Sequence, residues 1–166
     1  MPVTLSMPRP QDSIQAALER AREAAWDVVG NYTTPPWRFH VLTAAASALT
    51  WAHAHAVEQR QGADVAAQAR LQWGQIPGWV LVTCARAEDP QGAEHVQERS
   101  LTAVQRFSLS LWAEDLHTRW AQPDVMDTPA VAEQIDMDPA SEFVIGVLWF
   151  SEDADLLPPP NAIQAV

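Results

Sequence analysis

Apolar residues recur with two different periods along this chain, and the two periods predict a mixture of helices and strands. From Ile14 to Val28, apolar residues return every three to four positions, with charged residues between them. This spacing places the apolar side chains on one face of an amphipathic helix. Asp12 or Ser13 is expected to cap the start of this helix, and Gly30 is expected to end it.

After a pair of prolines the pattern changes to alternation. Residues 37–42 alternate between apolar and polar, which is the period of a half-buried strand. Further strands are predicted over 79–85, 120–125 and 143–150. The segment 79–85 is apolar on both faces, so we expect it at the centre of a sheet.

Helices are predicted for the remaining long segments. Residues 44–60 and 63–73 are rich in alanine, and Gly62 separates them. Residues 94–116 contain no glycine or proline and form the longest predicted helix, and their apolar face places this helix at the spine of the domain. A threonine followed by proline favours a short helix over 128–135. Together these elements predict an α+β fold.

Length and composition indicate one soluble domain. The chain has 166 residues, 48% of them hydrophobic, and eight tryptophans, which is enough to bury a substantial core. We expect an extended arm over 1–12, the folded domain over 13–151 and an acidic, proline-rich tail over 152–166. No apolar run has the length of a membrane span and no secretory signal pattern is present, so a cytoplasmic location is expected.

The charge excludes several classes of function. A net charge of −11 argues against nucleic-acid binding, which needs a basic face. All ten basic residues are arginine, so Schiff-base and P-loop chemistry that depends on lysine is excluded. Cys84 is the single cysteine, which cannot form an internal disulfide, and the apolar run before it predicts a buried, inert thiol.

Other catalytic patterns are missing. The chain contains neither the Gly-x-Ser-x-Gly motif of many hydrolases nor the Gly-x-Gly-x-x-Gly motif of dinucleotide-binding folds. His53 and His55 are two residues apart on a predicted helix, so they point to different faces and predict no metal site. His117 is the histidine that we would choose for a titrating group near a ligand.

Two segments carry a resemblance to a known family. Pro36-Trp37-Arg38-Phe39 resembles the end of the Ser-x-x-Asn-x-Gln-Pro-Trp-x-Phe segment of the nitroreductases, a family of FMN-dependent oxidoreductases. Where that family has Ser, Asn and Gln, this chain has Gly30, Thr33 and Pro35. Residues 105–120 resemble a second family segment, Gln-Asn-Leu-x-Leu-Ala-Ala-x-x-x-Gly-Leu-Gly-Thr-x-Trp. The residues that match it are Gln105, Leu109, Leu116, Thr118 and Trp120, while Arg106 replaces the Asn and Asp115 and His117 replace the two glycines.

The resemblance implies a nitroreductase-like three-layer α+β domain, with a mostly antiparallel sheet flanked by helices. It also implies a homodimer with FMN at the subunit interface and NAD(P)H as reductant. Arginine is suited to the FMN phosphate because its planar fork makes paired hydrogen bonds. The candidate cofactor-binding residues are Thr33, Thr34, Pro36, Trp37, Arg38, Arg106, Thr118 and Arg119.

Two functions are open at this point. The first is an FMN-dependent NAD(P)H oxidoreductase that reduces nitroaromatic or quinone-like small molecules, with the proline segment and the long helix forming a cradle for the flavin. In this family the flavin carries the chemistry, so no catalytic side chain is assigned. The second is a non-catalytic homodimer of the same fold that has lost FMN and binds another small ligand or acts as a scaffold. In that case the three arginines are ordinary ion-pair partners and Trp37 is a core residue of an edge strand.

Overall fold

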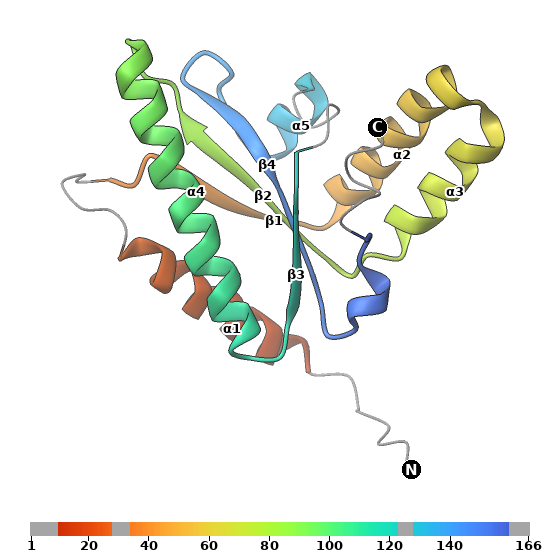
Figure 1. The fold of residues 1–166 in the computed structure, drawn as a ribbon, viewed down its shortest axis with the longest axis horizontal. Coiled ribbons are helices and arrows are strands. Elements are labelled where there is room, and N and C mark those ends of the chain that lie inside the picture. The colour runs from red at the N-terminus through yellow and green to blue at the C-terminus, as the bar shows by residue number, and fades with distance from the viewer. Residues whose placement is uncertain (1–9, 28–33, 123–127, 160–166) are drawn as a thin grey trace.

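The computed structural model describes residues 10–27, 34–122 and 128–159 (Figure 1). The predictions made for residues 1–9, 28–33, 123–127 and 160–166 lie outside these ranges. The elements are, in order, α1 Gln11–Trp26, β1 Trp37–Leu42, α2 Ala44–Gln61, α3 Ala63–Gly74, β2 Gly78–Ala85, α4 Pro90–Trp112, β3 His117–Ala121, α5 Pro129–Gln134, β4 Glu142–Ser151 and the 3-10 helix η2 Ala154–Leu156.

The strands form one antiparallel sheet in the order β1-β2-β4-β3. The predicted central position of β2 is confirmed, because this strand pairs on both sides and is buried along nearly its whole length. The register between β2 and β4 shifts where Val82 pairs with Gly146 and Thr83 pairs with Val144. This irregularity changes which side chains of β4 share a face.

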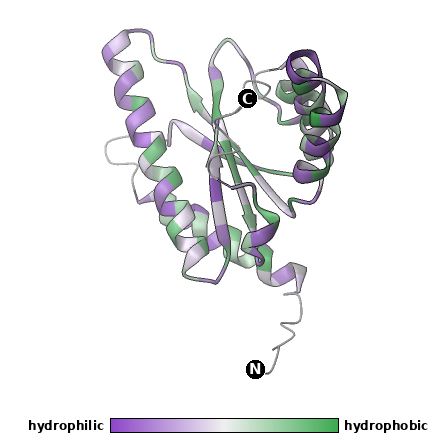
Figure 2. Cartoon of the chain, turned by 45° about the vertical axis from the view of Figure 1, so that its right-hand side comes forward, coloured by the Kyte–Doolittle hydropathy of each residue, from purple (hydrophilic) through white to green (hydrophobic). Residues whose placement is uncertain are grey.

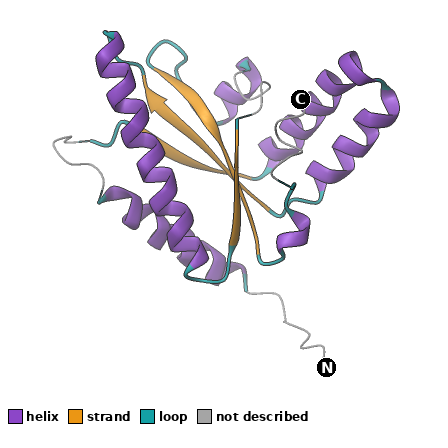
Figure 3. Cartoon of the chain, in the orientation of Figure 1, coloured by secondary structure: helices purple, strands orange, loops and turns teal. Residues whose placement is uncertain are grey.

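Helices cover both faces of the sheet, so the predicted three-layer α+β architecture is confirmed (Figures 1 and 3). On one face, α1 and α4 pack against the sheet through a core that includes Ala21, Val82 and Phe107. On the other face, α2, α3 and α5 enclose a second core around Trp79 and Trp149. Figure 2 shows that the central strands are predominantly hydrophobic, whereas the edge strand β3 and the helices include hydrophilic residues. Among the described residues, no helix combines the length and apolarity needed to span a membrane.

Some element boundaries differ from the prediction. Helix α4 begins at Pro90 rather than at residue 94, because the Asp89 side chain accepts a hydrogen bond from the Gly92 amide at 2.8 Å and caps the helix. It ends at Trp112, and Asp115 follows with a positive φ of 59°. Helix α1 begins at Gln11 after Pro10, without a side-chain cap, so neither predicted capping residue has that role. The capping residue predicted for α5 is confirmed, since Thr128 accepts from the Val131 amide.

The acidic segment after β4 folds back onto the domain. Asp153 accepts a hydrogen bond from the Asp155 amide at 2.9 Å and starts the turn of η2. Leu157 is then buried in the second core. The beginning of the predicted tail therefore contributes to packing on the face covered by α2, α3 and α5.

Candidate functional site

The described part of the proline segment, residues 34–36, lies directly before β1. Thr33 is outside the described residues, and Thr34 is exposed to solvent. Pro36 is half-buried, and its carbonyl oxygen accepts a hydrogen bond from the Ala85 amide at 2.7 Å. This bond continues the pairing of β1 with β2 and fixes the segment at the edge of the sheet.

The space between this segment and α4 is filled by side chains. Trp37 is only 4% exposed and belongs to the core shared with α1 and α4. Two residues further on, the Phe39 ring stacks on Phe107 of α4 with 4.5 Å between the ring centroids. The cradle predicted here is therefore occupied by the core. Trp37 lies where the alternative interpretation placed it, in the core of an edge strand.

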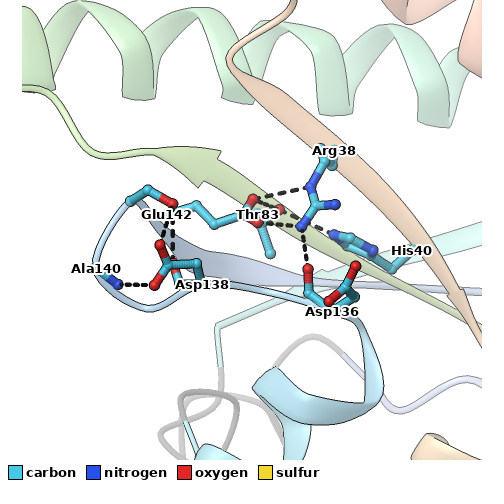
Figure 4. A network of polar contacts seen from close by, with 8 residues as sticks. Arg38, His40, Thr83, Asp136, Asp138, Ala140 and Glu142 are labelled. Carbon is cyan, nitrogen blue, oxygen red and sulfur yellow. Dashed lines mark hydrogen bonds and ion pairs between the residues drawn. The ribbon is translucent and has the colours of Figure 1, made fainter.

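Arg38 points to the opposite face of β1 and is held by an acid. Its guanidinium donates to both carboxylate oxygens of Glu142 on β4, with 3.1 Å between Nε and Oε2. One terminal nitrogen of Arg38 also donates to the backbone carbonyl of Asp136 at 3.1 Å (Figure 4). This paired geometry is the arrangement in which arginine binds a carboxylate most specifically. The positive charge of Arg38 is thus already balanced within the chain.

The network continues into the sheet through Thr83, which is fully buried on β2. Its hydroxyl donates to Glu142 Oε2 at 3.0 Å, and it lies 3.1 Å from Nε2 of His40. Because the Thr83 proton is used on the carboxylate, the contact with His40 requires Nε2–H of the imidazole to donate. Burial, assisted by the charge of Arg38, lowers the pKa of His40 to about 4. His40 is therefore neutral at physiological pH, with Nδ1 as the hydrogen-bond acceptor.

A cavity of about 560 Å³ lies beside this network. Its walls include His40, Asp136 and Arg22. Asp136 has a φ of 52°, an unusual backbone conformation for a residue that is not glycine. Chemically, the site offers a neutral imidazole between an ion pair and a solvent-accessible carboxylate. It is suited to hydrogen bonding with an uncharged ligand, because the neighbouring Arg38 is paired with Glu142 and the lining Arg22 is paired with Glu19 at 2.9 Å.

The sequence contained part of the signal for this network. Arg38 and His40 are two positions apart on a predicted strand, so a shared face was foreseeable. Thr83 and Glu142 gave no such signal, because the register of the sheet brings them beside β1. Their roles were missed in the sequence analysis.

The other predicted residues lie elsewhere. Arg119 on β3 donates from Nε to the carbonyl oxygen of Pro158 at 3.0 Å. Arg106 is exposed on α4. Thr118 faces α4, where its hydroxyl is 2.5 Å from that of Ser108 and accepts from the Trp112 indole at 2.6 Å. Since β1 and β3 are the two edge strands, Arg38 and Arg119 lie at opposite edges of the sheet and do not converge.

The two helical histidines face different directions, as predicted. His53 is buried and stacks on Trp73 with 3.7 Å between ring centroids, whereas His55 is exposed. Burial lowers the pKa of His53 to about 4. Within the described ranges, no three metal-ligating side chains come together. Cys84 is buried as predicted, and burial raises the pKa of its thiol to about 11.

The fold matches solved nitroreductases, although no protein-family model and no curated protein matches the sequence. A nitroreductase-like family protein from Bacillus cereus aligns with a TM-score of 0.64 and 15% identity, over 87% of this chain and 75% of that one. An FMN-dependent nitroreductase from Mycobacterium smegmatis, solved in complex with NADPH, gives a TM-score of 0.63 and 15% identity over 96% and 84%. A nitroreductase family protein from Clostridium novyi gives 0.59 and 17% over 95% and 82%. The resemblance identified in the sequence is thereby confirmed at the level of the fold.

Proposed function

We propose that this protein is an FMN-dependent NAD(P)H oxidoreductase of nitroreductase type, which acts on small nitroaromatic or quinone-like molecules. The observation that carries the proposal is the shared fold, since the alignment with the FMN-dependent enzyme from Mycobacterium smegmatis spans 96% of this chain. That enzyme is described as FMN-dependent and was solved with NADPH. At 15% identity the specific substrates are part of the proposal and rest on this likeness alone.

Three of the described candidate residues are already used in contacts within a single copy. Arg38 is paired with Glu142, and Arg119 is bonded to a backbone carbonyl at the opposite edge of the sheet. Thr118 uses its hydroxyl on Ser108 and Trp112. The proposal requires that a second copy of the chain completes the site.

Helix α4 offers a surface for such a second copy. Leu109 and Trp112 are three residues apart on its outer side, and their exposed fractions are 59% and 57%. Neighbouring large apolar side chains exposed on a helix are typical of protein interfaces. We therefore propose a homodimer that packs through α4. Light scattering coupled to size exclusion should give a dimer mass for the natural protein and a monomer mass for Leu109→Glu.

A second function is favoured by the Arg38 network. Arg38 is paired with Glu142, and the neighbouring His40 is neutral. This arrangement suits an uncharged ligand better than a phosphate. In this alternative the protein is a flavin-free homodimer that binds another small molecule or serves as a scaffold. Both candidates share the fold and differ in whether flavin binds.

The visible spectrum of the purified protein, before and after addition of FMN, separates the two. Retained or restored flavin absorbance, together with oxidation of NADPH or NADH in the presence of a nitroaromatic acceptor, supports the oxidoreductase. Saturable FMN binding without turnover supports a binding role. Failure to bind FMN at any concentration tested, by a protein that is dimeric and folded, excludes the oxidoreductase.

A further inference from the structure

A larger cavity of about 780 Å³ lies at the other end of β1, away from Arg38. It is bounded by α2, α3 and the segment that leads into β2. Its volume is in the range of sites that enclose small organic molecules. Three tryptophans line it, namely Trp51 on α2, Trp73 on α3 and Trp79 on β2.

The aromatic floor of this cavity is rigid. Trp73 and Trp79 meet edge to face with 5.6 Å between ring centroids, and each also meets Trp149 in the same way. The His53 imidazole stacks on Trp73 and supports it. The indole nitrogen of Trp79 donates to the carbonyl of Ile76 at 3.3 Å. Trp73 and Trp79 are only 6% and 3% exposed, so they form a fixed base for the cavity, whereas Trp51, at 60%, is the tryptophan whose ring a ligand can cover.

The charge of the cavity is opposite to that of the chain. The sequence contains 21 acidic residues and has a net charge of −11, yet none of the residues that line this cavity is acidic. Arg70 is the one charged residue among them, and Ser47, Thr50 and Gln75 add polar groups. The net negative charge of the chain repels anions from most of its surface. The lining of this cavity has one arginine and no acidic residue, so an anion is favoured here.

Arg70 is held in a position from which it can donate. Its guanidinium carbon lies 4.5 Å from the centroid of the Trp51 ring. Stacking of this kind uses the face of the guanidinium and leaves the N–H edge for a paired contact with a carboxylate. Within the described ranges, no carboxylate lies at ion-pair distance from Arg70, in contrast to Arg38.

We propose that this cavity binds a planar aromatic carboxylate, with its ring against Trp51 and its carboxylate on Arg70. The exposure of Trp51, 60%, and of Leu71, 70%, leaves apolar surface at the mouth that such a ring would cover. A smaller cavity of about 260 Å³ shares Trp51 and Arg70, but Glu58 lines it and disfavours an anion there. The larger cavity is therefore the binding site, and it lies at the opposite end of β1 from Arg38.

The proposal is tested by isothermal titration calorimetry of the natural protein with 2-naphthoate. We expect saturable binding with one site per chain. The neutral analogue 2-naphthylmethanol and the non-aromatic cyclohexanecarboxylate should each bind at least about tenfold more weakly, because one lacks the charge and the other lacks the flat ring. Equal binding of 2-naphthoate and 2-naphthylmethanol would overturn the role of Arg70.

Variants locate the site. Arg70→Gln should weaken 2-naphthoate binding by roughly tenfold or more, because a charge-assisted paired contact is lost. Trp51→Leu should weaken it several-fold. Arg99→Gln, at an exposed position of α4 in the opposite layer, is the matched control and should bind as the natural protein does. Unchanged affinity of Arg70→Gln, with circular dichroism like that of the control, would refute the proposal, whatever the outcome of the flavin experiments.

Discussion

Arg38 and Arg70 belong to the same acidic chain, but their surroundings give them opposite capacities. Arg38 is closed by Glu142 and by the Asp136 carbonyl, and the buried Thr83 and the half-buried His40 extend its network into the sheet. Arg70 stacks on Trp51 at the edge of a cavity that has no acidic lining residue. The resemblance to a family motif pointed to Arg38, whereas the local contacts leave Arg70 available for an anion. Motif position and available charge are therefore separate properties.

The largest loss of stability is expected where core side chains fill the space between β1 and α4. Phe107→Ala removes the ring that stacks on Phe39 and leaves a cavity in the core between β1 and α4. The free energy of unfolding should fall by about 3–5 kcal/mol. Chemical denaturation measures this change. Trp51→Ala, at the open cavity, is the matched control, and its expected change is within about 0.5 kcal/mol. Equal losses in both variants would contradict the filled packing at β1.

A smaller loss of stability is expected when the Arg38 network is changed at Thr83, which contacts both His40 and Glu142. Thr83→Val keeps the shape of the side chain but removes the hydroxyl that links His40 to Glu142. Because these partners are left without one of their hydrogen bonds, unfolding should become easier by about 1–3 kcal/mol. Thermal unfolding of this variant beside Thr102→Val, on the exposed side of α4, provides the measurement and its control. A neutral Thr83→Val result would show that the network adds nothing to stability.

Acid should destabilise the protein through two histidines of lowered pKa, the half-buried His40 and the buried His53. The folded-state pKa values of His40 and His53 are each about 4, below the ordinary value of 6.5, so the unfolded chain binds more protons in this window. Stability is therefore lost as the pH falls from about 6.5 towards 4, by roughly 1–3 kcal/mol for each histidine. Urea unfolding at several pH values should show this slope.

The same measurement on substituted chains assigns the slope. His40→Gln should reduce it by about half, while His55→Gln, at an exposed position of α2, should leave it unchanged. An imidazole pKa near 6.5 for His40, measured by NMR, would remove the physical basis of this prediction. It would also show that the closed network tolerates a charged imidazole.

The secondary structure was largely predictable because its signals are local. The residues of β1 were predicted without error, and α2 and α3 to within a residue at each end. The start of α4 was missed, although Asp89 followed by proline carries the same capping signal as the threonine-proline pair that was recognised before α5. The polar residues, proline and glycine of 87–92 also fit a loop, which obscured this helix start.

The candidate site was predictable only in part. Arg38 and His40 could be assigned to one face of a strand from their spacing. The partner that decides the chemistry of Arg38 is Glu142, which is 104 residues away in the chain. No periodicity connects two residues at that separation, because their contact depends on strand order and on the irregular register of β4.

By itself, the sequence determined the helices, the strands β1, β2 and β4 and the α+β class, because apolar spacing and helix caps act over a few residues. The strand predicted over 120–125 lies instead at His117–Ala121. Only the tertiary structure decided which arginine is neutralised and which remains open. Charges act on their neighbours in space, and the sheet order places Glu142 beside Arg38 while the α2–α3 hairpin places a tryptophan beside Arg70.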